Sequence, residues 1–362
     1  MKLFVITGES SGDLHASDVV RELKRKHHNI VIKGWGGDKL DEAGMEIKVH
    51  IKELAVMGIT DVIKKMPFFY FLYRKCKSQI KEFKPDALLL VDYSGFNLRI
   101  AQWAKEQNIK VYFYIAPKTW AWRASRNKII ARSVDHLYCI FPFEEKYFRL
   151  NGVNATYVGN SLSKITIRSK TVKRNTIAVL PGSRVQELKS ILPVIRGLIE
   201  ALPAYTWIIS KVPHIPKSIY NNILGEKISA SISEAPSHDL LASTQIALIT
   251  SGTATLEASI IGCPQVVMYK TSILNYYIGK RFIKSRFISL PNILLDESFI
   301  DERIQNDLTI DNLILSISEI ETLTRLDRIK EKYEEIRRHL GDKNPANIVA
   351  KSIINQGVSK FS

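Results

Sequence analysis

Cysteines are scarce in this sequence, and recognisable metal-binding patterns are absent from it. Only Cys76, Cys139 and Cys263 occur among the 362 residues, and they lie far apart. Such spacing excludes a disulfide framework and a paired-cysteine metal motif, and it is typical of a reducing compartment. The eight histidines form no HExxH or HxH pattern, so we expect neither a metal nor another cofactor.

Long apolar runs are also missing. No stretch reaches the roughly eighteen apolar residues that a membrane-spanning helix needs. The first residues, MKLFVIT, carry one lysine and a short apolar run before a glycine–serine turn, so we expect no secretory leader there.

Acidic residues are few relative to basic ones. The chain has 52 lysines and arginines against 36 aspartates and glutamates, which gives a formal net charge of +16. A surplus of this size favours anionic partners, such as nucleic acid, phosphorylated ligands or an anionic membrane surface, although part of it can simply aid solubility. The hydrophobic content of 45% is that of an ordinary globular protein, and the length favours two domains.

Buried strands alternate with helical patterns along most of the chain. The predicted strands are residues 2–7, 30–35, 86–92, 110–117, 136–141, 176–182, 205–211, 227–233, 246–252 and 264–270. This alternation predicts an α/β fold with parallel sheets flanked by helices.

A polar, basic stretch at 163–175 predicts a linker between two Rossmann-like domains facing across a cleft. We therefore expect an N-terminal domain over 1–165 and a C-terminal domain over 175–320. Helices over 321–362 would pack back on the N-terminal domain or on a partner subunit.

Two turns of the second domain are typical of phosphate binding. In LPGSR (180–184), Gly182 allows a turn, Ser183 is a suitable helix N-cap, and Arg184 stands at the positive end of the helix. In SGTATLE (251–257), small residues let a phosphate approach the next helix, and Glu257 could reach ribose hydroxyls. The alternative is a plain capped helix at the first turn and a tight turn before a buried helix at the second. We favour nucleotide binding at the second turn.

Three segments of the first domain also carry polar residues at strand ends. Either Glu9, Ser10 and Ser11 line a cleft, or Ser11 and Asp13 cap the first helix. Asp92 ends a buried strand, where it either caps the next helix or faces a site and does chemistry.

The segment 112–130 places two tryptophans and two arginines after a strand. Trp120, Trp122, Arg123 and Arg126 suit a sugar or phosphate contact, whereas a hydrophobic plug is the alternative for at least one tryptophan.

Residues 57–84 combine aromatic side chains with lysines and arginines, which is typical of a segment lying in a membrane interface. A core helix with a basic face and a nucleic-acid surface are the alternatives. The predicted membrane contacts are Met66, Phe68, Phe69, Phe71 and Lys75.

Taken together, these stretches resemble the lipid-A-disaccharide synthases, bacterial glycosyltransferases of the two-Rossmann-domain GT-B type. The matching stretches, in chain order, are GESSGD, MGITDV, VDYSGFN, YIAPKTWAW, FPFE, YVGNSL, LPGSR, SGTATLE, VVMYK and LPNILL. They run from Gly8 to about Gln305. One of them would be weak evidence, but all of them in the family's order are highly specific.

The resemblance implies a reaction without a metal. A UDP-linked 2,3-diacylglucosamine would donate its sugar to 2,3-diacylglucosamine 1-phosphate, with inversion, and form the β-1,6-linked disaccharide 1-phosphate and UDP. The enzyme would be cytoplasmic and peripheral on the anionic inner face of the inner membrane. A homodimer is left open, and no nucleic acid is expected as a partner.

The resemblance also implies roles for single residues. It makes Asp92 the catalytic base and places Glu9, Arg184 and Asn292 at positions that activity needs. The expected substrate contacts are Ser10, Ser11, Asn97, Trp120, Arg184 and Asn292. The expected UDP contacts are Gly182, Ser183, Ser251, Gly252, Thr253 and Glu257.

The sequence departs from the family pattern at a few positions. Ser94 and Gly95 follow the aspartate turn where the family commonly has a proline, Asn160 and Ser161 stand where histidine or asparagine and then proline are usual, and Lys164 replaces a usual acid. Because Asp92 is kept, we expect the activity and leave the acyl-chain length open.

Two alternatives belong to other functional classes. Another UDP-sugar enzyme of the same fold, such as a UDP-N-acetylglucosamine 2-epimerase, would not need the aromatic and basic segment. A nucleic-acid-binding protein would show steep salt dependence and no UDP binding.

Overall fold

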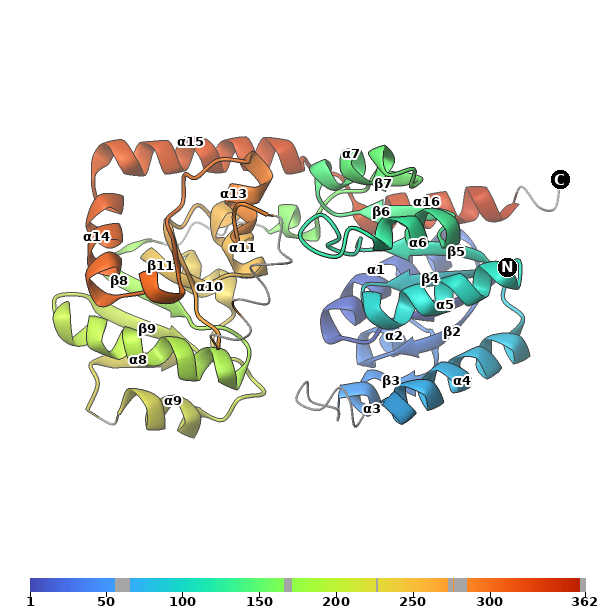
Figure 1. The fold of residues 1–362 in the computed structure, drawn as a ribbon, viewed down its shortest axis with the longest axis horizontal. Coiled ribbons are helices and arrows are strands. Elements are labelled where there is room, and N and C mark those ends of the chain that lie inside the picture. Colours follow the sequence, from blue (N-terminus) through green and yellow to red (C-terminus); the bar gives the residue numbers. More distant parts are fainter. Residues whose placement is uncertain (56–65, 166–170, 226, 273–275, 277–284, 359–362) are drawn as a thin grey trace. The chain divides into compact units, whose positions relative to one another are not determined.

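The computed structural model describes residues 1–362 except 56–65, 166–170, 226, 273–275, 277–284 and 359–362 (Figure 1). The MGITDV stretch (57–62) lies outside the described residues. Within the described part, no helix combines the length and the apolar character needed to cross a membrane. The chain divides into two compact units, Met1–Ser161 with Asp342–Ser362, and Leu162–Gly341.

Unit 1 is built on a parallel sheet of seven strands in the order β3-β2-β1-β4-β5-β6-β7. The strands are β1 (Lys2–Ile6), β2 (Val31–Gly36), β3 (Glu46–His50), β4 (Ala87–Val91), β5 (Lys110–Tyr114), β6 (His136–Cys139) and β7 (Ala155–Tyr157). Strand β4 is apolar at every position and β1 is apolar after Lys2, because both sheet faces are covered. In β1, Leu3 and Val5 enter one core cluster, whereas Phe4 and Ile6 enter the other.

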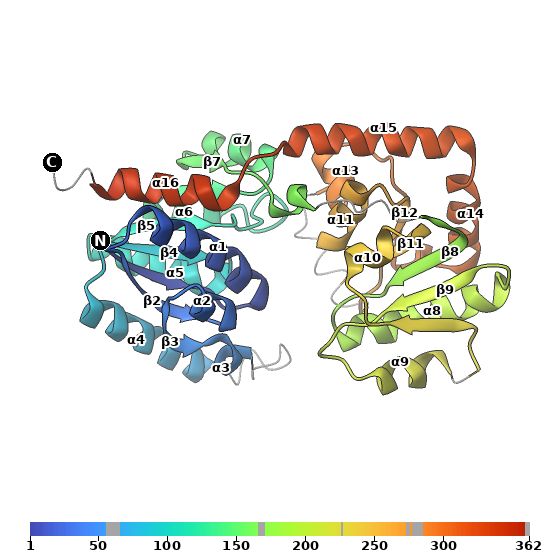
Figure 2. The same cartoon turned by 180° about the vertical axis from the view of Figure 1, so that it is seen from behind.

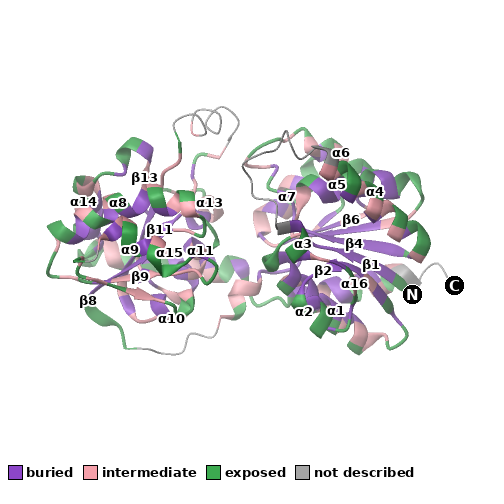
Figure 3. Cartoon of the chain, turned by 90° about the horizontal axis from the view of Figure 1, so that it is seen from below, coloured by how far each residue is buried: buried purple, intermediate pink, exposed green. Residues whose placement is uncertain are grey.

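Helices cover both faces of this sheet, and Figure 3 shows the buried strands between them. One face is covered by α1 (Ser10–Lys26), α2 (Asp38–Glu42) and α16 (Pro345–Val358). The opposite face is covered by α4 (Met66–Phe83), α5 (Ser94–Glu106) and α6 (Arg126–Ser133). Two short helices, α3 (Ile51–Ala55) and α7 (Pro142–Leu150), follow β3 and β6.

Unit 2 contains a parallel sheet of six strands in the order β10-β9-β8-β11-β12-β13. The strands are β8 (Lys173–Leu180), β9 (Thr206–Ser210), β10 (Ala230–Ser233), β11 (Thr244–Thr250), β12 (Gln265–Tyr269) and β13 (Glu302–Ile304). The described helices are α8 (Val185–Ala201), α9 (Lys217–Leu224), α10 (Ser237–Leu241), α11 (Thr253–Ile261), α13 (Leu290–Leu295), α14 (Ile310–Ile320) and α15 (Leu323–Leu340).

The C-terminal segment, expected as one block over 321–362, is divided between the units. In unit 2, α15 buries Ile329, Tyr333 and Ile336, and the Tyr333 hydroxyl donates to the carbonyl oxygen of Cys263 at 3.1 Å. In unit 1, α16 lies along α1 (Figure 2). The packing expected on the N-terminal domain is therefore seen for α16. Helix α15 instead packs against α11 in unit 2.

Each sheet has one point where the strand order reverses, between β1 and β4 in unit 1 and between β8 and β11 in unit 2. At such a point the two connections leave the sheet toward opposite faces, and a crevice opens at the carboxyl ends of the strands. Four motif turns of the sequence follow these four strands. They are the turns at Glu9, Asp92, Arg184 and Gly252, and the topology thus places them at the carboxyl edges of the two sheets.

Candidate active site

The turn after β4 presents Asp92 in a strained backbone conformation. Asp92 and Tyr93 both have left-handed dihedrals, with φ of 48° and 45°. Consecutive non-glycine residues in this region are costly, and they persist where the surrounding structure holds them. Here the Asp92 amide donates to the carbonyl oxygen of Tyr114 on β5 at 2.9 Å.

This geometry bears on the capping role, one of the two roles left open for Asp92. Helix α5 has Tyr93 at its N-cap position and no side-chain cap hydrogen bond. Asp92 thus lies one residue before the cap, and the capping role is not supported. The half-buried carboxyl group stays at the edge of the sheet.

Burial raises the pKa of Asp92, while Lys118, the Tyr93 amide and His15 counter this shift. Burial in turn lowers the pKa of His15, against the opposing charges of Asp18 and Asp92. A carboxylate with a raised pKa is a better proton acceptor, provided that it is still ionised at the working pH.

The turn after β1 packs directly against the Asp92 turn. A Cβ atom on Gly8 would lie 2.5 Å from Cγ of Tyr93, so only glycine allows this approach. Glu9 is exposed at the N-cap of α1. Burial of Tyr93 raises the pKa of its hydroxyl, and the charge of Glu9 raises it further. The structure therefore brings Glu9 and Asp92 to neighbouring turns.

Asn97 joins these two turns from behind. Its side chain is fully buried, and Nδ2 donates to the carbonyl oxygen of Asp92 at 2.8 Å. The same nitrogen is 3.4 Å from the carbonyl oxygens of Ile6 and Val91. Asn97 was expected to contact substrate, but in this position it acts on the Asp92 backbone.

Ser10, Ser11 and Asp13 at the start of α1 differ in their surroundings. Ser10 and Ser11 are exposed in the first turn of α1. The buried Asp13 carboxylate accepts from the amides of Gly37 (2.6 Å) and Lys39 (3.0 Å) at the start of α2. Asp13 thus caps α2 and not its own helix, a correction that depends on a contact distant in sequence.

The two tryptophans after β5 also differ. Nε1 of Trp120 donates to Oε1 of the buried Glu144 at 3.1 Å. Burial raises the pKa of Glu144 to about 7, against the Trp120 hydrogen bond and two backbone amides. Trp120 is half-buried, with its ring 5.1 Å from that of Phe143, whereas Trp122 is 43% exposed.

In unit 2, the LPGSR turn is occupied by the chain's own carboxylate. Oε2 of Glu187 accepts from the amides of Ser183 (2.8 Å) and Arg184 (3.2 Å). The N-cap of α8 is Arg184 and not Ser183 as expected. Gly182, at φ 107°, lies so close that a Cβ atom would meet Oε2 of Glu187. The predicted cradle of amides at this helix is thus filled.

The side chain of Arg184 remains accessible. It is 65% exposed, and its one ion pair in the described structure joins Nη1 to Oε1 of Glu187 at 3.1 Å. A surface pair of this kind contributes little to stability, so the guanidinium can turn to a ligand at low cost.

The SGTATLE turn differs because its helix end is open. Gly252 is the N-cap of α11 and the described residues provide no side-chain cap. Gly252 and Thr253 are exposed, and Oγ of Ser251 donates to the carbonyl oxygen of Ile288 at 2.7 Å. An uncapped helix N-terminus attracts anions through its free amides and its dipole. Of the two turns predicted to bind phosphate, this one has amides free to bind an anion.

Glu257 lies one turn into the same helix. It is half-buried and accepts from Oγ of Ser237 at 2.9 Å. Burial raises its pKa, and Ser237 and His238 oppose the shift. Its position beside the open helix end fits a hydrogen-bond acceptor for ribose hydroxyls.

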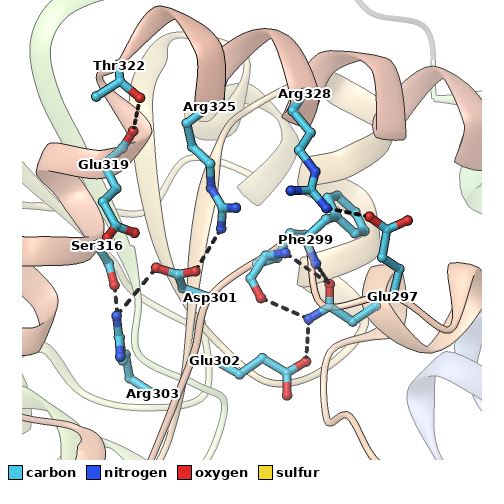
Figure 4. Close-up of polar contacts among 12 residues, drawn as sticks. Glu297, Phe299, Asp301, Glu302, Arg303, Ser316, Glu319, Thr322, Arg325 and Arg328 are labelled. Atoms are coloured by element: carbon cyan, nitrogen blue, oxygen red, sulfur yellow. Dashed lines mark hydrogen bonds and ion pairs between the residues drawn. The ribbon is translucent and has the colours of Figure 1, made fainter.

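Asn292 binds the backbone of the segment before β13 in the interior of unit 2. Its side chain is fully buried, Nδ2 donates to Ile300 O and Glu302 Oε1 at 2.9 Å each, and Oδ1 accepts from the amides of Phe299 and Ile300. Figure 4 shows Phe299 and Glu302 in this cluster, with Arg325 and Arg328 of α15 on Asp301 and Glu297. Asn292 therefore positions the chain before β13, although it was expected at the substrate.

The aromatic segment on α4 has two sides. Phe68 and Phe69 are partly buried and pack against the core of unit 1, whereas Tyr70 and Phe71 are 62% and 58% exposed. Lys75 is partly exposed, and the side chain of Met66 lies outside the described residues. The predicted membrane contacts Phe68 and Phe69 are thus better explained as core residues, and Tyr70 joins Phe71 on the surface.

Two further features of the sequence are the stretch at Asn160 and the lack of a metal-binding pattern. Asn160 is buried and donates to the carbonyl oxygen of Ile140 at 3.2 Å, and Ser161 and Lys164 bound a short 3-10 turn. Among the described residues, no group of three or more His, Cys, Asp or Glu side chains is arranged to hold a metal.

Comparisons with known proteins show the family of the chain. A family model described as "Lipid-A-disaccharide synthetase" matches residues 3–355. The chain is 32% identical over 374 residues to the lipid-A-disaccharide synthase of Anaeromyxobacter dehalogenans (strain 2CP-1 / ATCC BAA-258), covering 98% of this chain and 97% of the relative.

Similar solved structures share the fold at low identity. The glycotransferase of kitacinnamycin aligns with a TM-score of 0.65 and 15% identity over 98% of each chain. The UDP-GlcNAc 2-epimerase from Neisseria meningitidis bound to UDP-GlcNAc aligns with a TM-score of 0.63 and 14% identity, covering 99% of this chain and 100% of that one. The expected fold class, two Rossmann-like domains of the GT-B type with C-terminal helices, is thereby confirmed.

Proposed function

Because this chain belongs to the lipid-A-disaccharide synthase family, we propose that it transfers 2,3-diacylglucosamine from a UDP donor to 2,3-diacylglucosamine 1-phosphate. The products are the β-1,6-linked disaccharide 1-phosphate and UDP. The enzyme is a hexosyltransferase. The single observation that carries its proposed mechanism is Asp92 at the reversal point of the unit 1 sheet, where it is half-buried, has a strained backbone and does not cap α5.

Asp92 serves as the general base. A sugar hydroxyl is a poor nucleophile until its proton is removed during attack, and a positioned carboxylate performs this step. The acceptor 6-hydroxyl attacks the anomeric carbon of the donor, its proton passes to the Asp92 carboxylate, and UDP leaves from the opposite face. A single displacement of this kind converts an α-linked donor into a β-linked product.

The donor nucleotide binds at the open end of α11. The free amides at Gly252 and Thr253 suit the diphosphate, and Glu257 accepts from the ribose hydroxyls. Arg184 supplies a cation at the neighbouring turn, where it balances charge that develops on the leaving UDP. Glu9 lies on the turn against Tyr93, where it would orient the acceptor.

Both substrates carry acyl chains, so the enzyme works at the anionic cytoplasmic face of the inner membrane. The exposed pair Tyr70 and Phe71 on α4, with Arg74 stacked on Tyr70 at 5.9 Å, suits such an interface. The net charge of +16 adds attraction to anionic lipids.

The test is release of UDP from the diacylated donor, measured with and without the monosaccharide phosphate. A transferase releases UDP in step with the disaccharide and only when the acceptor is present. Release of UDP, or epimerisation of the donor sugar, independent of the acceptor would contradict the proposal and favour another UDP-sugar enzyme of this fold.

A further inference from the structure

A group of arginines surrounds one exposed tryptophan in the segment that follows β5, the strand paired with β4, in unit 1. The guanidinium carbons of Arg123 and Arg126 lie 4.4 and 5.7 Å from the centre of the Trp122 ring. Arg99 is exposed on α5, the helix that follows Asp92, and α5 packs against α6, which begins at Arg126. We call Arg99, Trp122, Arg123 and Arg126 the Trp122 cluster.

The arginines of this cluster have no acidic partner in the part of the chain that the structure describes. Several arginines elsewhere on helices are paired with an acid on the same helix, such as Arg149 with Glu145 at 2.7 Å and Arg196 with Glu200 at 3.2 Å. Burial lowers the pKa of Arg126, and the charges of Arg123 and Arg99 lower it further. Like charges held together in this way are relieved when an anion binds between them.

The backbone that carries the cluster is held by contacts of its own. Arg123 has a left-handed backbone at φ 57°, an uncommon conformation for a residue with a long side chain. The buried Asn127 fixes the start of α6, since its Oδ1 accepts from Oγ1 of Thr119 at 2.6 Å and its Nδ2 donates to the Tyr147 hydroxyl at 2.8 Å. A site prepared in this way loses little conformational freedom on binding.

We propose that the Trp122 cluster binds the phosphate monoester of the acceptor, an inference that rests on the proposed function. Guanidinium groups bind phosphate oxygens in a bidentate manner, and a monoester carries more negative charge than the phosphodiester of a bilayer phospholipid. Several unpaired guanidiniums therefore match the sugar 1-phosphate best.

The position of the cluster favours the acceptor over the donor. Its loop leaves β5, the strand next to β4, and Lys118 in the same loop is close enough to lower the pKa of Asp92. A phosphate held here would place the acceptor sugar near the base. The donor diphosphate already has a suitable site at α11 in unit 2.

The experiment pairs a protein change with a substrate change. The double variant R123Q/R126Q is compared with the parent on two acceptors, 2,3-diacylglucosamine 1-phosphate and the same lipid without its phosphate. We expect the parent to favour the phosphorylated acceptor in kcat/KM by about tenfold or more, the worth of a charge-assisted hydrogen bond. In the variant this preference should fall close to one, with the KM for the donor unchanged.

The matched control is K128Q/R132Q, which removes two exposed cations from the same helix. It should keep the parental preference for the phosphorylated acceptor. Binding of each protein to phosphatidylglycerol vesicles and each melting temperature are measured alongside.

Two results would overturn the inference. One is an unchanged preference for the phosphorylated acceptor in R123Q/R126Q. The other is equal loss on both acceptors together with weaker vesicle binding, which would make the cluster a membrane-docking surface. Failure of the parent to form any disaccharide would instead contradict the proposed function, so the two failures are distinguishable.

Discussion

The ring of Tyr93 lies against Gly8 so closely that a Cβ atom on that glycine would stand 2.5 Å from Cγ of the ring. This contact joins the turn that carries Glu9 to the turn that carries Asp92. The relative position of the two carboxylates therefore depends on a residue with no side chain.

Replacing Gly8 by alanine should displace Tyr93 and lower both stability and turnover. Overpacking of this kind costs about 1–3 kcal/mol of folding free energy. Thermal unfolding and steady-state kinetics measure the two effects. Gly95→Ala is the control, because a Cβ atom there meets nothing within 4 Å and alanine favours the helix. Equal behaviour of the two variants would show that the Gly8 contact does not position the site.

The pH dependence of kcat/KM should carry the signature of Asp92. The base acts only when deprotonated, and burial raises its pKa, so the acid limb should lie above the ordinary aspartate value of about 4. Because Lys118 lowers this pKa, Lys118→Gln should move the acid limb to higher pH. The exposed Lys128→Gln serves as the control. A limb that stays in place in Lys118→Gln would separate Asp92 from the observed titration.

Glu257→Ala should weaken UDP binding by about tenfold to a hundredfold, the worth of one charge-assisted hydrogen bond. Titration calorimetry with UDP measures this loss. Glu187→Ala provides the contrast, since Glu187 caps α8 and its loss should cost about 1 kcal/mol of stability without a comparable loss of UDP affinity. The reverse pattern would place the nucleotide at α8.

Substitution of Tyr70 and Phe71 by serine should weaken binding to anionic vesicles with little change in melting temperature, because both side chains are exposed. Phe68→Ser with Phe69→Ser should instead destabilise the fold, since each half-buried ring contributes at most roughly 1.5–3 kcal/mol of transfer free energy. Vesicle sedimentation and thermal unfolding separate the effects. Unchanged vesicle binding in the Tyr70 and Phe71 variant would remove this surface from the account.

The sequence predicts the central strands well because their apolar runs are buried on both faces. It misses the edge strands β3, β7 and β13, which have polar or half-exposed positions, such as Glu46 and Lys48 in β3. Edge strands carry a weak pattern because water reaches one side of them.

The motif turns are located correctly by the sequence, but the partners of single side chains are not. Asp13 caps α2, which is distant in sequence. Glu187 accepts hydrogen bonds from the amides before α8 that were expected to hold phosphate. Asn97 and Asn292 were expected to contact substrate, and their side chains donate to backbone carbonyl oxygens. Such contacts depend on tertiary geometry that a local pattern does not encode. The helical period of α4 could have indicated that Phe68 and Phe69 share the buried side with Leu72.

The most direct test of the account is the kinetics of Asp92→Asn. Asparagine has nearly the same shape but accepts no proton, so the variant should keep the parental melting temperature and UDP affinity. Its turnover with the phosphorylated acceptor should fall by about a hundredfold or more, the usual contribution of a general base. Normal turnover in Asp92→Asn would contradict the central claim, and the base would have to be sought at Glu9, on the neighbouring turn.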